Sequence, residues 1–311
     1  MRFAAVLNGL QRQPTFHASI VGRATNWATR KYTEGMILSL GVLHAPALWT
    51  LSAVATLAYI AAFALNHRAS VWAANAMLLA WGAHALALAY DIFGTGQGAR
   101  FGFAPALSAT VWLVIAAHAI EQKSMVMAAA RRALALAGGV VCVLAAVYPG
   151  ELRAAESPWA PLHWLLGIVS YGLFGAAVVH AWLLSRAETR MRLPRASQAS
   201  VPTDPTRVGM PLLMLERLTF RFVDAGFVVL TITLLLGGWF AWHAVGGWRW
   251  DHKTVFSLAG WLTFALLVAG RHAYGWRGKR ATRWVYVGAV LLLLAYVGSR
   301  FVLEVLLARA P

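Results

Sequence analysis

The sequence predicts an all-α fold, a polytopic membrane bundle of about eight transmembrane helices. Sixty per cent of its 311 residues are hydrophobic and only 12% are charged, whereas soluble domains carry about a quarter charged residues. The mean hydropathy is +0.63. The apolar residues form continuous blocks long enough to cross a hydrocarbon core of about 30 Å, which takes about 20 residues per helix. A soluble globular domain is therefore excluded.

Continuous blocks also exclude a transmembrane β-barrel, whose strands alternate apolar and polar side chains. A formal charge of +16 would indicate a nucleic-acid partner in a soluble protein. Here the Arg and Lys residues lie mostly in short connections between apolar blocks, so they indicate membrane topology instead. The expected partner is the lipid bilayer, with no nucleic acid. The single cysteine, Cys142, lies within an apolar block and excludes an internal disulfide.

Eight apolar blocks give the expected spans, in chain order. They lie near 45–65, 71–92, 102–120, 133–149, 160–184, 222–243, 254–270 and 284–307. We divide the chain accordingly into an N-terminal extension (1–35), a four-helix membrane region (36–158) and a C-terminal membrane domain (159–311). The extension is polar and basic and lacks the apolar stretch of a signal peptide. We expect the protein to start at Met36; the alternative is that 1–35 is an N-terminal cap.

Three basic connections set the expected orientation. They lie at about 121–132, 187–220 and 271–283, and they alternate with acidic or mixed connections such as GWRWDHK. Cytoplasmic loops carry an excess of Arg and Lys. The basic connections are therefore expected in the cytoplasm, and the Trp-rich GWRWDHK segment on the periplasmic face of a bacterial inner membrane.

The segment 237–267 is the most informative part of the chain. Its clustered tryptophans and the polar residues after them are Trp239, Trp242, Trp248, Trp250, Asp251, His252 and Lys253. An interfacial aromatic belt accounts for tryptophan at this depth, but it does not require an imidazole or paired charges. A flat apolar macrocycle with carboxylate arms would bind such a surface, through aromatic faces, cations and an imidazole for a metal.

Residues 248–251 read W-R-W-D, with Trp239 twelve residues before Asp251 and Trp261 ten residues after it. In this pattern the sequence resembles the WWD domain of the haem-handling cytochrome c assembly proteins CcsA, CcmC and CcmF. Lys253 falls on the lysine of that family. The likeness extends over roughly 160–302 and is closest to the small YpjD/HemX-like branch, whose endings resemble GWRGKR and AYVGSRFVLEVLL.

Two shorter motifs extend the resemblance. His163 followed by Ser170-Tyr171 matches the family's H-x6-S-Y, whose histidine is an outward-facing haem ligand, and AYVGSR (295–300) resembles its T-Y-x-G-V-N. Other positions depart from the family. Ala244-Val245 replaces a Trp-Gly, the in-membrane histidine falls on Ala269, and no histidine follows His272. The resemblance therefore implies haem handling without the full ligand set of CcsA.

The histidines are sorted by depth. His84 lies inside its span, where an ionisable side chain is costly and usually marks function; the alternative is a neutral imidazole hydrogen-bonded to a neighbouring helix. His163 is expected as an axial haem ligand, with His84 or His252 as the second ligand. The histidines at the cytoplasmic ends are expected to be interfacial; they are His67, His118, His180 and His272.

The predicted function is binding or presentation of haem, or a related tetrapyrrole, at the outer face of the membrane in cytochrome c assembly, together with other assembly proteins. Trp239, Trp248 and Trp250 would stack on the macrocycle beside Asp251. Arg249, Lys253 and Arg300 would pair with the propionates. No catalytic constellation is evident. Two alternatives stay open: a scaffold or regulator that kept the fold but lost haem, and a small-solute or ion transporter, which intramembrane acids such as Glu216, Asp224 and Glu304 favour. We expect these acids to pair with Arg217, Arg221 or Arg300.

Overall fold

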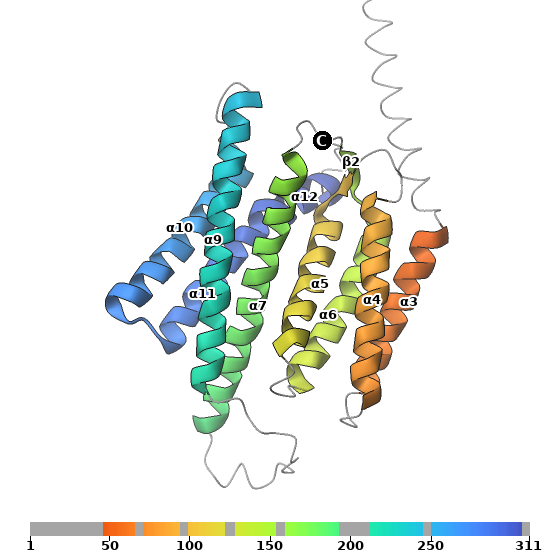
Figure 1. Cartoon of the computed structure of the whole chain (residues 1–311), viewed down its shortest axis with the longest axis horizontal. Helices are drawn as coiled ribbons and strands as arrows, with labels where there is room; N and C mark the ends of the chain where they lie inside the picture. Colours follow the sequence, from red (N-terminus) through yellow and green to blue (C-terminus); the bar gives the residue numbers. More distant parts are fainter. Residues whose placement is uncertain are drawn as a thin grey trace, which may run out of the picture. The chain divides into compact units, whose positions relative to one another are not determined.

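The computed structural model describes residues 46–65, 71–93, 99–121, 128–153, 159–192, 212–244 and 250–306. Eight helices in these ranges are long and apolar enough to cross a membrane, which confirms the predicted bundle (Figure 1). They are α3 (Pro46–Leu65), α4 (Val71–Phe93), α5 (Phe103–Glu121), α6 (Ala128–Val147), α7 (Ala160–Arg192), α9 (Leu212–Ala244), α10 (His252–Tyr274) and α11 (Gly278–Leu293). The last span continues from α11 through η2 (Leu294–Gly298), α12 (Ser299–Phe301) and η3 (Val302–Leu306).

Two helices are longer than their apolar runs. The predicted spans 160–184 and 222–243 correspond to α7 and α9, which extend to Arg192 and back to Leu212. These extensions are rich in Leu, Met, Arg and Glu, which favour the helix whether or not lipid surrounds it. Apolar composition marks the part of a helix that crosses the bilayer, so it underestimates the helix itself.

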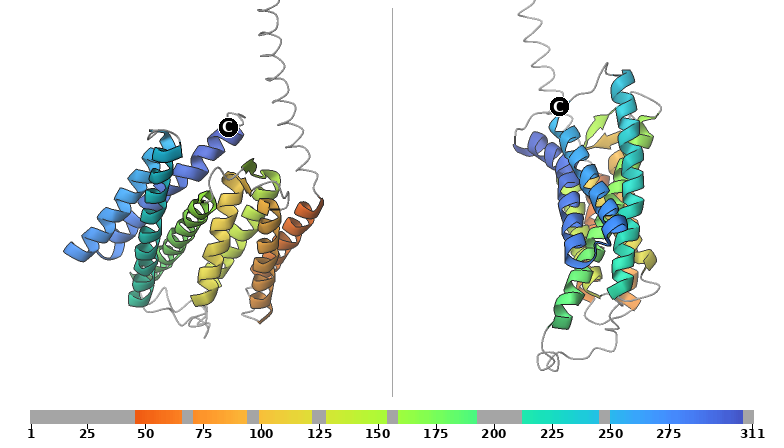
Figure 2. Two further views of the ribbon diagram at one scale, coloured as in Figure 1. Left: turned by 45° about the horizontal axis from the view of Figure 1, so that its top comes forward. Right: turned by 90° about the vertical axis from the view of Figure 1, so that its left-hand side faces the viewer.

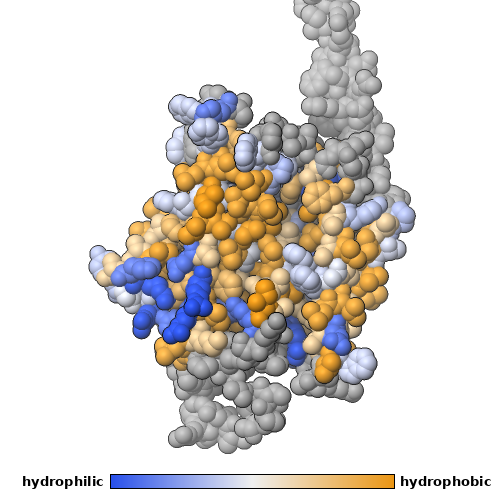
Figure 3. All heavy atoms as spheres, viewed as in Figure 1, coloured by the Kyte–Doolittle hydropathy of each residue, from blue (hydrophilic) through white to orange (hydrophobic). Residues whose placement is uncertain are grey.

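Large apolar side chains cover the outside of the bundle. Leu57, Leu79 and Leu235 are examples that stay well exposed. Figure 3 shows apolar side chains across the middle of the face it displays, with hydrophilic ones over the α10–α11 turn and at the tip of α9. Lipid tails solvate apolar side chains as well as a protein core does. Association between the helices therefore depends on small residues and specific contacts.

The helices pack around two main cores. One joins α3–α6, with Tyr59 and the free Cys142 inside it. The other joins α7, α9, α10 and α11, where the rings of Phe174 and Phe264 stack with centroids 3.9 Å apart. Residues 46–309 nevertheless belong to one unit, and the predicted division at 158/159 stays a prediction. Residues 1–35 lie outside the described ranges, as does His67.

A two-stranded sheet marks one end of the bundle. β1 (Ala99–Phe101) pairs antiparallel with β2 (Glu151–Arg153), and Phe101 lies opposite Glu151. Arg300 of α12 approaches Glu151 at 3.6 Å and Glu304 at 3.8 Å. The starts of α7 and α10, the C-terminal end of α9 and the last helix all lie at this end (Figures 1 and 2). We call it the strand end.

The opposite end corrects one expectation. His118 and His180 were expected to be interfacial, but both are buried, at 4% and 1% exposure. His180 Nε2 is in contact with the Glu121 carboxylate, and the guanidinium of Arg131 is buried in the same cluster. Helices α5, α6 and α7 pack closely enough here to enclose these side chains. Depth along a span does not reveal which way a side chain faces.

The intramembrane acids are partly as expected. Glu304 pairs with Arg300 within one helical turn, which confirms that pairing. Glu216 and Asp224 of α9 instead lie within electrostatic range of Arg271 of α10, a residue 47 positions beyond Asp224 in the chain. The neighbouring helix therefore supplies the counter-charge that was expected from Arg217 or Arg221.

Candidate functional site

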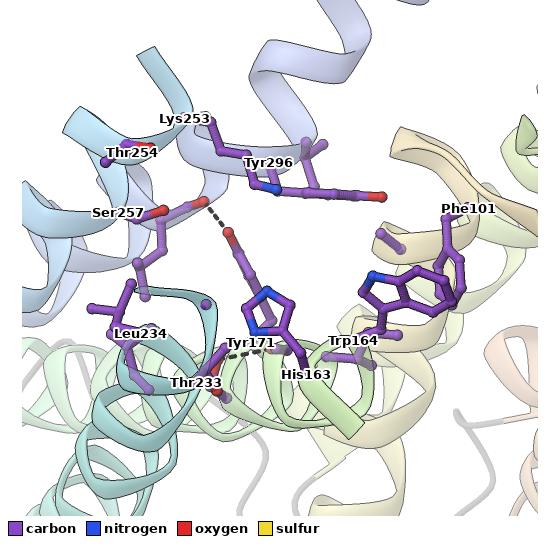
Figure 4. A pocket seen from close by; sticks show the side chains of 18 of the residues that line it. Phe101, His163, Trp164, Tyr171, Thr233, Leu234, Lys253, Thr254, Ser257 and Tyr296 are labelled. Atoms are coloured by element: carbon purple, nitrogen blue, oxygen red, sulfur yellow. Dashed lines mark hydrogen bonds between the residues drawn. The ribbon is translucent and has the colours of Figure 1, made fainter. Parts of the chain in front are cut away.

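A cavity of about 460 Å³ lies at the strand end. Its walls come from α5, α7, α9, the first turns of α10 and the π-helical η2, together with Phe101 of β1. Figure 4 shows His163 and Trp164 on α7 facing Lys253 and Tyr296 across this space. Segments from 101 to 297 thus converge on one cavity, as is usual for ligand sites between the helices of a bundle.

His163 is the imidazole of this cavity. It lies in the first turn of α7, and its Nδ1 atom is buried with no hydrogen-bond partner among the described residues. The ring rests edge-on against Phe240, with centroids 6.3 Å apart. Buried polar atoms are nearly always hydrogen-bonded. The buried Nδ1 is shielded from the cavity, but His163 as a residue lines it, so the imidazole can offer its other nitrogen to a ligand there.

Gly237 makes room for that imidazole. A Cβ atom at this position would lie 2.9 Å from His163 Cε1, closer than real Cβ contacts. Gly237 and Gly238 sit near the C-terminal end of α9, and both line the cavity. Glycine inside a helix costs about 1 kcal/mol relative to alanine. Here it permits the close approach of α9 to α7 at the histidine.

Asp251 fixes the entrance to α10. It is the N-cap residue of α10, in extended conformation, and its carboxylate accepts a hydrogen bond from the Thr254 backbone N–H at 2.8 Å. Burial alone would raise the pKa of this carboxyl, but the hydrogen bonds from Thr254 and the charge of Lys253 hold the pKa below its ordinary value. The capped helix projects Lys253 into the cavity, with Nζ 5.5 Å from the centroid of the Tyr296 ring.

Most hydroxyl groups on the cavity wall are already engaged. Tyr171 donates to the Leu292 carbonyl at 2.6 Å, Ser170 to that of Gly167 at 2.7 Å and Thr233 to that of Val229 at 2.8 Å. The remaining wall is largely apolar and aromatic, with Trp164 packed on Phe101 at 4.7 Å between centroids. The site therefore offers one imidazole and one ammonium group, with the Asp251 carboxylate at its edge, among largely apolar walls.

This chemistry suits a flat apolar ring with anionic substituents. Aromatic walls favour a planar ligand, and the ammonium of Lys253 would attract a carboxylate. In the described part of the chain, no three His, Cys, Asp or Glu residues gather so that they could hold a metal ion. A metal at His163 would thus need most of its ligands from outside the protein, which the four nitrogens of a porphyrin provide.

The other predicted ligands lie elsewhere. His84 is 1% exposed in the α3–α6 half, with Nδ1 3.1 Å from the Tyr59 hydroxyl and Nε2 2.7 Å from Ser108 Oγ. Both of its ring nitrogens thus have protein partners, the arrangement of a structural histidine. His252 begins α10 as an exposed residue and does not line the cavity.

The predicted aromatic platform is only partly described. Trp239 and Trp250 are 62% and 75% exposed and do not line the cavity. The Trp239 ring stacks instead on His243 of its own helix, with centroids 4.1 Å apart. Trp248 and Arg249 lie outside the described residues. Arg300, expected to pair with a propionate, is engaged with two carboxylates at the strand end.

Sequence reasoning missed several wall residues. Phe101 comes from a part of the chain without any recognised motif, and only folding brings it to the cavity; Trp164 lies within H-x6-S-Y, next to His163, but was not singled out. Tyr171 and Tyr296 lie within the H-x6-S-Y and AYVGSR motifs, so the motifs contained a signal that was not used. Gly237 could have been found as one of two consecutive glycines next to a tryptophan in an apolar helix.

Fold and cavity define a class: a multi-pass helical membrane protein with a histidine-bearing cavity at one end of its spans. A sequence model of the cytochrome c assembly proteins matches residues 69–307, most of the chain. The chain belongs to this family, and the resemblance inferred from the Trp-rich motif is confirmed.

Relatives of two kinds share this similarity. The inner membrane protein YpjD of Escherichia coli (strain K12) is 30% identical over 166 residues, which cover 52% of this chain and 60% of that protein. A cytochrome c biogenesis protein CcsA of Synechococcus elongatus is 28% identical over 233 residues, covering 60% of this chain and 71% of that protein. The chain thus spans about 60% of the length of the YpjD relative. No solved structure matches.

Proposed function

We propose that this inner-membrane protein binds haem, or a related tetrapyrrole, in the cavity at the strand end and presents it during cytochrome c assembly. The observation that carries the proposal is the imidazole of His163, which lines a cavity of about 460 Å³ together with Lys253 and aromatic side chains. Membership of the cytochrome c assembly family supports the same ligand class. The haem would be cargo, passed on to other assembly proteins.

Each wall of the cavity has a part in this proposal. His163 ligates the iron, and Gly237 leaves the imidazole room to face the cavity. Trp164 and Phe101 exclude water from the ring, and Lys253 pairs with a propionate near the entrance. Axial ligation, burial and hydrogen bonding are the means by which a protein tunes bound haem. His84 is left out of the ligand set, because both of its nitrogens already have partners.

Orientation is part of the proposal, because haem for cytochrome c is used outside the cytoplasm. The excess of Arg and Lys in 187–220, between the apolar runs of α7 and α9, supports a cytoplasmic opposite end and a periplasmic strand end. Reporter fusions after residue 200 and after residue 252 are expected to give opposite signals. Matching signals would overturn this topology and with it the periplasmic presentation of haem.

The central test is the visible spectrum of the purified protein with added haem. Wild type is expected to show a Soret band that reports ligation by imidazole. His163→Ala should lower haem occupancy or shift that band. His272→Ala is the matched control: it removes an exposed imidazole at the opposite end of α10 and should change neither property.

Two results would count against the proposal. A wild-type protein that shows no Soret band after haem supplementation would favour the scaffold or regulator alternative. An unchanged spectrum in His163→Ala would keep haem and discard this ligand. Circular dichroism of each variant separates loss of the ligand from loss of the fold.

A further inference from the structure

The cavity supplies a single imidazole. Within the described residues His163 is the only histidine on its wall. His84 is bonded to Tyr59 and Ser108, and His243 and His252 are exposed residues outside the lining. A macrocycle ligated by His163 therefore has no second imidazole facing its other side.

The side opposite His163 is formed by a π-helix. The last span changes from α-helix to π-helix at Leu294–Gly298, and this turn presents Tyr296 and Val297 to the cavity. Single π turns are rare and are frequent at functional sites, because one extra residue per turn redirects the side chains that follow. Figure 4 shows His163 below and the Tyr296 ring above, edge-on to the viewer, with the cavity between them.

We propose that a haem bound as described above, on which this inference rests, is ligated by the protein on one axial side only, and that the Tyr296 ring covers its other face. An imidazole nitrogen approaches the iron along the normal of the macrocycle, so the ring lies across the His163 axis. The Tyr296 ring then stacks on the second face, as aromatic surfaces do. The iron keeps a sixth position that only a ligand from outside this cavity fills.

Two residues beside Tyr296 are poor candidates for that sixth position. Lys253 carries an ammonium group, which has no lone pair for iron, and its Nζ lies 5.5 Å from the centroid of the Tyr296 ring. The Tyr171 hydroxyl donates to the Leu292 carbonyl at 2.6 Å. In Figure 4 the Tyr296 hydroxyl points along the cavity towards the Trp164 side and not towards His163.

The inference predicts a distinctive spectrum for haem-loaded full-length protein. Ferric wild type is expected to be high-spin by absorption and electron paramagnetic resonance, since one axial imidazole leaves the iron high-spin and two make it low-spin. Tyr296→His places a second imidazole opposite His163 and should convert the signal to low-spin. Tyr296→Phe keeps the ring and removes the hydroxyl, so it should leave the wild-type spectrum unchanged.

A matched variant controls for imidazole placed elsewhere in the same helix. Tyr286→His substitutes another half-buried tyrosine, ten residues earlier and about 15 Å along the helix. It should stay high-spin. Free imidazole should bind Tyr296→Ala more tightly than wild type, because the stacked ring no longer covers the open position.

Each contrary result has a separate meaning. A low-spin wild type, or a Tyr296→His variant that stays high-spin while binding haem, would overturn the one-sided site and leave haem binding intact. A spectrum altered by Tyr296→Phe would make the phenol oxygen a ligand and overturn the stacking role. Absence of any Soret band would overturn the proposed function and this inference together.

Discussion

The two halves of the bundle place a histidine in opposite surroundings. In the α3–α6 half, His84 is enclosed and bonded through both nitrogens to Tyr59 and Ser108. In the half built from α7 and α9–α11, His163 faces a cavity with its Nδ1 unpartnered. Both residues lie in apolar helices, and the sequence offered both as haem ligands. Their neighbours distinguish them.

The surroundings of His84 and His163 differ more in the volume of the adjacent cavity than in polarity. The hollow beside His84 also contains Asp91, a buried acid whose carboxylate oxygens have no hydrogen-bond partner among the described residues, yet its volume is only about 10 Å³. That is close to the minimum for one water molecule. The cavity beside His163 measures about 460 Å³. A polar group in a membrane bundle indicates a ligand site when there is room for the ligand.

Replacing His84 should produce the largest loss of stability. His84→Ala leaves the Tyr59 and Ser108 hydroxyl groups buried without their partner, which we expect to lower the free energy of unfolding by about 2–4 kcal/mol. Haem occupancy of the folded fraction should not change. Thermal unfolding in detergent and the Soret band measure the two properties. His163→Ala should show the reverse pattern, and a His84→Ala variant that loses haem while keeping its stability would make His84 the ligand.

Gly138 tests the tight packing of the same half. A Cβ atom there would lie 2.6 Å from Tyr59 Cζ, in a ring held by its bond to His84. Gly138→Ala is therefore expected to destabilise the fold by about 1–3 kcal/mol, as overpacking does. Gly139→Ala is the matched control, because its Cβ would meet Tyr59 only at 3.7 Å. Equal unfolding temperatures for the two variants would contradict this account of the core.

Gly237 makes the corresponding test in the open half. Gly237→Ala forces the His163 imidazole to move, so we expect haem affinity to fall about tenfold, equivalent to about 1.4 kcal/mol, with the fold retained. Haem titration followed at the Soret band measures this. Gly167→Ala adds a methyl group to the same cavity wall but meets only Thr233, at 3.9 Å, and should bind haem as wild type does. Loss of affinity in both variants would point to cavity volume and not to His163.

Asp251 should give the smallest effect. Asp251→Ala removes the N-cap of α10, at a cost of about 1 kcal/mol, whereas Asp251→Asn keeps a capping oxygen and should cost less. Because the pKa of Asp251 is lowered in the folded protein, its carboxylate contributes stability above the unfolded pKa of about 4, and this contribution is lost as the pH falls through the folded pKa. Unfolding temperatures across this pH range should converge for wild type and Asp251→Asn on acidification.

Much of the molecule followed from the sequence alone. In lipid, a long uninterrupted apolar segment is stable only as a helix, which satisfies its own backbone hydrogen bonds. The class of protein and all eight spans were therefore predictable. The family followed from the spacing of Trp239, Asp251 and Trp261. Asp251 and Lys253 of the Trp-rich motif line the cavity; their part in haem binding stays a prediction, and the capping role of Asp251 was not foreseen.

The tertiary structure alone decided which of these residues meet. The spans are apolar on almost every side, so their periodicity does not reveal which face turns inward. A helix face that contacts lipid has the same apolar composition as a face that is buried in the protein. Packing between α7 and α9 places His163 against Gly237, 74 positions away, and a local π turn presents Tyr296 to the same cavity. The enclosure of His84, His118 and His180 was settled in the same way, by the rotation of each helix about its axis.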